Sequence, residues 1–154
     1  MTELTEGLKA PALHLPTDDG GQFDLARAGG PVVVFFYPKA DTPGCTVESQ
    51  DFSALKPDFD KLGVQVIGVS RDPVKKLARF RAKHGLTVLL GSDEAGTVTE
   101  AWGVWVQKQL YGRTYMGIER ATALVGPDGR LARVWRKVSV KGHATEVLVA
   151  ATRL

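Results

Sequence analysis

Cysteine is almost absent from this chain of 154 residues, because Cys45 is the only one. A single cysteine excludes an internal disulfide framework and also the Cys-x-x-Cys pair of a thioredoxin-type disulfide reductase. The three histidines, His14, His84 and His143, have no metal-ligand spacing to one another or to Cys45, so we expect no metal site. A lone thiol without disulfides is typical of a reducing compartment.

Long apolar runs and a strong charge of one sign are also lacking. No run approaches the roughly 20 apolar residues of a membrane span, and no basic segment followed by an apolar stretch marks the N-terminus as a signal peptide. The net charge of +3 is modest, and Lys and Arg are spread along the chain, which argues against nucleic-acid binding. The glycines form no phosphate-binding fingerprint. We therefore expect one soluble cytoplasmic domain over residues 1–154, without membrane or nucleic-acid partners.

Cys45 lies where a buried strand is followed by a helix. The apolar, β-branched run 32–37 predicts a central strand, and a turn containing Pro, Asp and Gly follows it. Thr42 and Pro43 predict an N-cap and a first helical residue, which places Cys45 in the first helical turn. Free backbone N–H groups and the helix dipole favour the thiolate there, and the thiolate is the nucleophile. The alternative is that Cys45 is a small buried hydrophobic residue.

The pattern Pro38-x-x-x-Thr42-x-x-Cys45 after an apolar strand resembles the active-site signature of the peroxiredoxins. The longer run 36–46 is similar to the bacterioferritin-comigratory-protein branch, also called the Q type. Later segments that resemble the same branch are residues 63–72, 89–93, 101–105 and 111–120. The resemblance thus covers nearly the whole chain, and it implies a thioredoxin-like α/β fold with a central mixed sheet flanked by helices.

The resemblance implies a role for each matching residue. Cys45 would attack a peroxide oxygen and become a sulfenic acid. Arg120 would stabilise the charge on the departing oxygen, and the hydroxyl of Thr42 would hold the peroxide beside the sulfur. Pro38 would fix the loop and shield the thiolate from water. The remaining expectations are Glu48 as a residue that positions Arg120, Gly44 as a source of backbone donors, and Tyr37 and Trp105 as pocket walls.

Each role has an ordinary structural alternative. Arg120 could be one solvated arginine among many, and Thr42 could only cap a helix. Pro38 could only end a strand, and Glu48 could be a surface carboxylate near a helix start. The three tryptophans, Trp102, Trp105 and Trp135, are more often core residues than ligand platforms.

At one position the chain differs from many Q-type peroxiredoxins. Many Q-type relatives carry a second, resolving cysteine five residues after the first, where this chain has Gln50. With no second cysteine in the chain, an external thiol must reduce the sulfenic acid, or two Cys45 residues must pair between molecules. The expected activity is therefore a one-cysteine, thiol-dependent reduction of hydrogen peroxide and organic hydroperoxides that needs no cofactor and serves antioxidant defence.

The sequence leaves several points open. The reductant could be thioredoxin, glutaredoxin or a low-molecular-weight thiol, and the preference between hydrogen peroxide and alkyl hydroperoxides is not readable. We expect a monomer, with a dimer as the alternative. A peroxide sensor without turnover, or a redox-regulated binding module, is the second functional hypothesis. A cysteine hydrolase would need a histidine base beside the thiol, and no histidine is suitably placed.

The hydrophobic pattern predicts alternating strands and helices. Segments 12–15 and 22–25 predict an N-terminal hairpin, and 120–125 with 131–137 predict a second hairpin around Gly126-Pro-Asp-Gly129. Strands are expected at 32–37, 64–70 and 88–90. A first helix is expected from residue 43 and should be kinked or divided near Pro57. A second should start with Asp72 as its cap and Pro73 as its first residue. Two more helices are expected over 94–102 and at the C-terminus. The first few residues are expected to be frayed.

Overall fold

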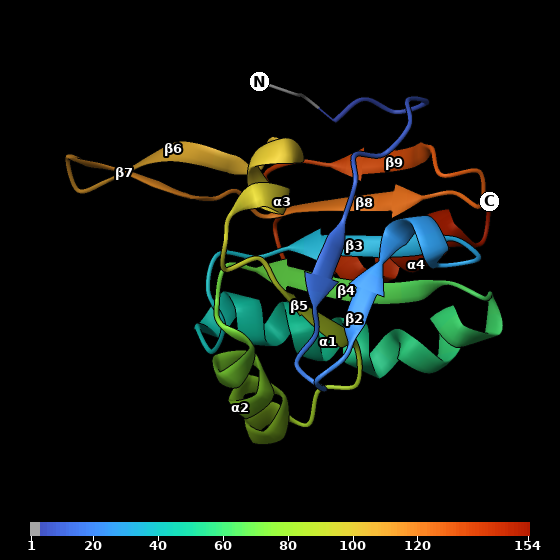
Figure 1. The fold of residues 1–154 in the computed structure, drawn as a ribbon, viewed down its shortest axis with the longest axis horizontal. Coiled ribbons are helices and arrows are strands. Elements are labelled where there is room, and N and C mark those ends of the chain that lie inside the picture. Colours follow the sequence, from blue (N-terminus) through green and yellow to red (C-terminus); the bar gives the residue numbers. More distant parts are fainter. Residues whose placement is uncertain (1–3) are drawn as a thin grey trace.

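A five-stranded mixed sheet forms the centre of the molecule, which we describe over residues 4–154 of a computed structural model. The strand order is β5-β4-β3-β8-β9, in which β3, β4 and β5 are parallel, and β8 is antiparallel to β3 and β9. Figure 1 shows these strands side by side. Their bounds are β3 Val32–Phe36, β4 Gln65–Ser70, β5 Leu89–Ser92, β8 Ala121–Val125 and β9 Leu131–Trp135.

Both faces of this sheet are buried. In β3, Val33 and Phe35 face a core formed with α1 (Pro43–Lys61), α2 (Val74–His84) and α4 (His143–Ala151). Val32, Val34 and Phe36 face the opposite core, which is covered by the hairpin of β1 (His14–Pro16) and β2 (Gln22–Asp24) and by α3 (Thr97–Ala101). Burial on two faces explains why β3 reads as a continuous apolar run.

The predicted N-terminal hairpin and the hairpin around residues 126–129 are confirmed. The expectation of frayed first residues falls on 1–3, outside the described residues. Two of the expected helices differ in their bounds. The helix expected over 94–102 spans only Thr97–Ala101, and α2 begins at Val74 with Pro73 as its N-cap. Asp72 does not cap α2, because its carboxylate bonds the backbone N–H of Ala40 and pairs with Lys76.

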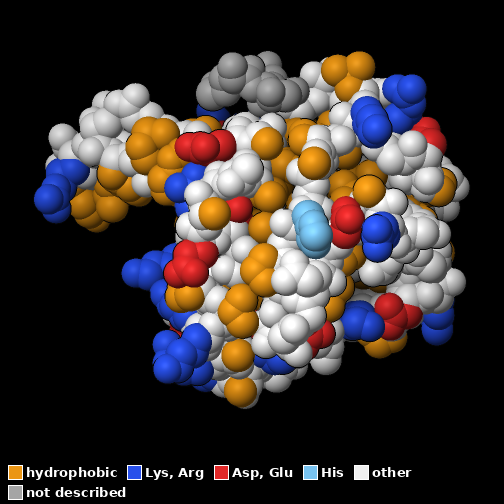
Figure 2. Space-filling view, in the orientation of Figure 1, with side chains coloured by type: hydrophobic (Ala, Val, Ile, Leu, Met, Phe, Trp, Pro, Cys, Tyr) orange, Lys and Arg blue, Asp and Glu red, His pale blue; other side chains and the backbone are white. Residues whose placement is uncertain are grey.

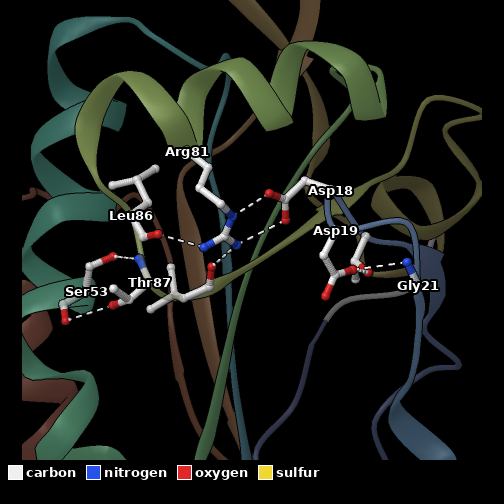
Figure 3. Close-up of polar contacts among 9 residues, drawn as sticks. Asp18, Asp19, Gly21, Ser53, Arg81, Leu86 and Thr87 are labelled. Carbon is white, nitrogen blue, oxygen red and sulfur yellow. Dashed lines mark hydrogen bonds and ion pairs between the residues drawn. The ribbon is translucent and has the colours of Figure 1, made fainter.

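Of the two alternatives expected for the first helix near Pro57, a division is wrong, since α1 continues through this proline, and a kink stays a prediction. Pro57 has no N–H to donate to the carbonyl of Ser53, four residues earlier. In the structure, the hydroxyl of Thr87 donates to that carbonyl at 3.2 Å, and the Ser53 hydroxyl accepts from the backbone N–H of Thr87 at 3.0 Å (Figure 3). A side chain from the loop before β5 thus satisfies the group that the proline leaves without a helical partner.

An ion-pair cluster joins the β1–β2 turn to α2 (Figure 3). The guanidinium of Arg81 binds both carboxylate oxygens of Asp18, whose side chain is only 1% exposed. The same guanidinium donates to the backbone carbonyls of Leu86 and Val88. Arg81 therefore connects α2, the loop that follows it and the N-terminal hairpin.

The sequence did not predict the hairpin formed by β6 (Trp105–Leu110) and β7 (Arg113–Ile118). These strands form a sheet of their own and project from the body of the molecule as an arm (Figure 1). Figure 2 shows hydrophobic and cationic side chains along this arm. Leu110, Tyr111, Tyr115 and Met116 are exposed on it. No helix among residues 4–154 is long and apolar enough to cross a membrane.

Candidate active site

Cys45 is the third residue of α1, directly after the loop that leaves β3. Thr42 is the N-cap and Pro43 the first helical residue, as the sequence predicts. The Cys45 side chain is only 1% exposed and packs in the same core cluster as Tyr37 and Ala40. The helix start therefore holds the sulfur at its positive end, beneath the surface.

Contacts from two neighbouring segments fix the loop before Cys45. The backbone N–H of Ala40 donates to Asp72 at 2.7 Å. Asp41 has a positive φ of 65°, and its carboxylate pairs with Lys83 at 2.9 Å and with His84 at 2.7 Å. The left-handed conformation is unfavourable for most residues with a side chain, so these ion pairs help to hold a turn that the sequence alone would not select.

Arg120, which is far from Cys45 in the sequence, places its guanidinium beside the sulfur. It lies in the two-residue link between β7 and β8, and its carbonyl accepts from the backbone N–H of Val138 at 2.9 Å. Its Nη2 donates to Cys45 Sγ at 3.5 Å, and its Nη1 donates to Glu48 Oε1 at 2.7 Å. One guanidinium thus contacts both Cys45 and Glu48.

Glu48 lies on α1, three residues after Cys45, and is 1% exposed. Burial raises its pKa to about 7, against the opposing effect of Arg120. No residue of the described chain hydrogen-bonds its second oxygen, Oε2. Burial alone would lower the pKa of Arg120, but Glu48 and Cys45 reverse that effect and raise it. The arginine is therefore a permanent cation beside the sulfur.

Gly44 and Thr42, close to Cys45 in the chain, have local roles that the sequence did not show. A Cβ at Gly44 would lie 3.2 Å from Arg120 Nη2, so the missing side chain makes room for the guanidinium. The Thr42 side chain makes no capping bond to the helix, and its hydroxyl donates to the carbonyl of Lys39 at 2.7 Å. With its proton engaged, the Thr42 oxygen remains free to accept.

The other expected site residues lie on two sides of this centre. Tyr37 is fully buried beside Cys45, close to Ser70, and burial raises the pKa of its phenol. Pro38 and Trp105 line a surface cleft of about 440 Å³ next to the loop. The structure thus brings Cys45, Arg120, Glu48, Gly44 and Thr42 together, with Tyr37 below them and Pro38 and Trp105 at the side.

Sequence reasoning missed three residues around this centre. Asp72 anchors the loop through Ala40, and Asp41 ties it to the end of α2. Lys108, on the projecting hairpin, interacts electrostatically with both Cys45 and Arg120. No sequence signal could have identified Lys108, because the strand pairing that aims it was itself not predicted. Among residues 4–154, no group of three or more His, Cys, Asp or Glu side chains is arranged to hold a metal ion.

The chain is similar to several known proteins over nearly its whole length. The model of the AhpC/TSA family matches residues 7–134. The peroxiredoxin Bcp of Xanthomonas campestris is 46% identical over 153 residues, which cover 97% of this chain and 96% of that protein. The Bcp of Bacillus subtilis is 45% identical over 143 residues, covering 92% of this chain and 91% of that protein.

Solved structures agree with this similarity. The X. campestris bacterioferritin comigratory protein superposes with a TM-score of 0.90 at 43% identity, covering 97% of this chain and 98% of the other. A Xylella fastidiosa PrxQ superposes with a TM-score of 0.93 at 35% identity, covering 99% and 98%. The expected thioredoxin-like fold of the peroxiredoxin type is confirmed.

A helix-start cysteine on this fold, matched over its length by peroxiredoxins, defines a thiol-dependent peroxidase. The chain belongs to the AhpC/TSA family, in its Bcp or Q-type peroxiredoxin branch. Within that branch its single cysteine corresponds to the one-cysteine form.

Proposed function

We propose that Cys45 is the peroxidatic nucleophile and that this chain reduces hydrogen peroxide and organic hydroperoxides by a one-cysteine cycle in the cytoplasm. The contact that carries the proposal is the hydrogen bond from Arg120 Nη2 to Cys45 Sγ at 3.5 Å. The alkyl peroxide reduction activity of the X. campestris bacterioferritin comigratory protein supports organic hydroperoxides as one substrate class.

The mechanism follows from the donors around the sulfur. The Cys45 thiolate attacks the nearer oxygen of the peroxide, the O–O bond breaks, and the sulfur keeps that oxygen as a sulfenic acid. The other oxygen departs as hydroxide or alkoxide and takes up a proton to form water or an alcohol. Arg120 is already beside the sulfur, so its fixed charge stabilises the developing negative charge without reorganisation.

Thr42 and Glu48 serve this step in different ways. The Thr42 hydroxyl donates to the Lys39 carbonyl, which leaves its oxygen to accept the peroxide O–H and hold the substrate in line with the sulfur. Glu48 holds one edge of Arg120 through Nη1 and leaves Nη2 directed at Cys45. Pro38 and the buried ring of Tyr37 limit access of water to the sulfur.

The return step needs a thiol from outside the molecule, because the chain has no second cysteine and Gln50 occupies the position of the resolving thiol. Attack by the external thiol forms a mixed disulfide with Cys45 and releases water. A second thiol then restores the thiolate. We propose that the chain completes this cycle as a monomer.

The test measures peroxide consumption with dithiothreitol, with thioredoxin and its reductase, and with glutathione and glutaredoxin. Hydrogen peroxide and cumene hydroperoxide serve as oxidants. Cys45→Ser is expected to abolish turnover, and Arg120→Met to lower kcat/KM by roughly 100- to 1,000-fold, as for the loss of one oxyanion donor. Gln50→Ala is the matched control on the same helix and should retain wild-type turnover.

Turnover by Cys45→Ser at the wild-type rate would overturn the assignment of the nucleophile. Consumption of one equivalent of peroxide followed by none, with every reductant, would instead support a peroxide sensor.

A further inference from the structure

A cleft of about 440 Å³ lies between the loop before Cys45 and the projecting β6–β7 hairpin. This volume falls within the range of about 300–1,000 Å³ that is usual for small-molecule sites. Its lining includes Pro38 and Lys39 from the loop, and Trp105, Lys108, Tyr115 and Ile118 from the hairpin. The cleft is thus bounded by the loop that precedes Cys45 and by the hairpin that precedes Arg120.

Two of the cations in this lining already have partners within the protein. The Arg71 guanidinium lies 3.4 Å from the centre of the Trp105 ring and donates to Thr99 Oγ1 and to the carbonyl of Gly96. Lys76 pairs with Asp72 at 3.1 Å. Asp72 is the acidic side chain in this lining, and its other oxygen is occupied by Ala40 and Ser70.

Among residues 4–154, the side-chain ammonium groups of Lys39 and Lys108 have no hydrogen-bond or ion-pair partner. Lys39 is exposed and Lys108 is partly buried. The stem of Lys108 lies along the hairpin over Gly117, where a Cβ would be only 3.3 Å from its Cδ. Burial lowers the pKa of Lys108, and nearby Arg120 lowers it further. Cys45 and Glu119 act in the opposite direction, but neither forms an ion pair with this ammonium, so it remains available to pair with an anionic ligand.

The cleft adjoins the segments that carry Cys45 and Arg120, although neither residue is part of its lining. Lys108 interacts electrostatically with Cys45 and Arg120. Pro38 follows Tyr37, which packs beside Cys45, and Ile118 is two residues before Arg120. Because Cys45 is only 1% exposed, a small thiol that enters the cleft reaches it with less rearrangement than a thiol on a flat protein surface.

We propose that this cleft binds a small carboxylate-bearing thiol through Lys39 and Lys108 and presents it to the oxidised Cys45. The inference rests on the proposed function and names the chemistry of its reductant. The thiolate attacks the Cys45 sulfenic sulfur, an S–S bond forms, the S–O bond breaks, and hydroxide leaves and is protonated to water. A second thiolate attacks the mixed disulfide, which releases the symmetrical disulfide and restores the Cys45 thiolate.

The experiment uses three thiols of similar size and different charge: 3-mercaptopropionate, 2-mercaptoethanol and cysteamine. The protein is first oxidised with one equivalent of hydrogen peroxide, and the rate constant of the reduction step is measured by stopped-flow tryptophan fluorescence. Rate constants are expressed per thiolate and are divided by the rate constants of the same thiols with a small uncharged disulfide, so that neither the ionised fraction nor the intrinsic nucleophilicity of each thiolate enters. We expect 3-mercaptopropionate to react about tenfold faster than 2-mercaptoethanol at low salt, cysteamine to be slowest, and the differences to shrink with added salt.

The variants are Lys39→Met, Lys108→Met and Lys108→Arg. The two methionine variants should lose the preference for 3-mercaptopropionate, and Lys108→Arg should keep most of it. Lys61→Met is the matched control, because Lys61 lies sixteen residues further along α1, about 24 Å from Cys45 at the usual helical rise, and it should behave as wild type.

Oxidation by hydrogen peroxide is measured separately on the same variants. A loss of thiol preference that clearly exceeds any change in the oxidation rate constant supports the proposal. Equal rate constants for the three thiols would overturn it, as would a charge preference that survives in both methionine variants. A change of the same size in the oxidation step would also overturn it, because the lysines would then act on Cys45 itself. Failure of oxidation in the wild type would instead contradict the proposed peroxidase centre.

Discussion

At the scale of single residues, Arg120 links Cys45 to Glu48. Its two terminal nitrogens divide their hydrogen bonds between Cys45 and Glu48. A lysine could supply the charge but not both directed bonds, because its ammonium lacks the rigid fork. The Glu48 carboxylate that accepts one of these bonds is buried, and burial of a charged group is energetically costly. The ionisation of Glu48 should therefore affect the stability of the protein.

The stability of the protein should therefore depend on the ionisation of Glu48. Burial raises its pKa from 4.5 to about 7 in the folded state, so the folded chain binds this proton more tightly than the unfolded chain does. The free energy of unfolding is then expected to fall as the pH rises from about 4.5 to about 7, by at most about 1.4 kcal/mol per pH unit. Glu48→Gln should lack this slope, as measured by urea unfolding at pH 5, 6, 7 and 8.

His143 contributes the opposite slope, because burial lowers its pKa and stability is lost as the pH falls below about 6.5. This contribution is common to wild type and Glu48→Gln, so the difference between the two proteins isolates Glu48. Identical slopes in both proteins would contradict the prediction. A wild type that gains stability relative to Glu48→Gln with rising pH would show that pairing with Arg120 outweighs burial.

At the scale of elements, the start of α1 must meet the β7–β8 link at close range. Asp41 holds a left-handed turn before the helix, and Asp72 bonds the backbone at Ala40. Gly44 then lets Arg120 approach the first helical turn, where the dipole also acts. The site therefore depends on how closely a helix and a loop from distant parts of the sequence can approach one another.

Gly44→Ala tests this close approach. The new Cβ would lie 3.2 Å from Arg120 Nη2, so the guanidinium must move by a few tenths of an ångström. We expect kcat/KM for hydrogen peroxide to fall roughly tenfold, since a displacement of 1 Å can cost about 100-fold. Thermal stability should not fall, because alanine is favoured over glycine inside a helix by about 0.5–1 kcal/mol.

Gln50→Ala on the exposed side of the same helix serves as the control and should leave both quantities unchanged. An unaltered kcat/KM in Gly44→Ala, with an intact fold, would show that the position of Arg120 is not limiting.

At the scale of the whole molecule, polar contacts join segments that the sheet does not pair. Arg81 connects Asp18 of the N-terminal hairpin with α2 and with the loop before β5. Thr87 of that loop in turn satisfies the α1 carbonyl that Pro57 leaves unpaired. The hairpin, α2 and α1 are thus connected through residues 81–88.

Arg81→Met is expected to destabilise the protein by about 3 kcal/mol, because it leaves the buried Asp18 carboxylate and two carbonyls without their donor. Urea unfolding at pH 7 measures the change. Lys56→Met is the control: its pair with Asp60 is exposed, and its loss should change stability by no more than about 0.5 kcal/mol. A loss for Arg81→Met as small as that of the control would show that the cluster does not connect these elements energetically.

The predictable part of the fold came from local patterns. The apolar run of β3, the Thr42-Pro43 helix start and the Gly-rich turn at residues 126–129 each identify an element within a few residues of its observed bounds. The β6–β7 hairpin was missed because most of its side chains are exposed and its strands pair only with each other. The continuity of α1 was missed because the donor that replaces the proline N–H, Thr87, lies thirty residues away.

The sequence by itself determined a single cysteine at a helix start, the absence of a second thiol in the chain, and the family to which the matching segments belong. These properties depend on residue identity and on neighbours within one turn. Only the tertiary structure decided that Arg120 spans Cys45 and Glu48, that Gly44 makes room for it, and that Lys39 and Lys108 share one cleft. Those relations depend on distances between residues 69 to 76 positions apart in the sequence, which packing sets and local propensity does not.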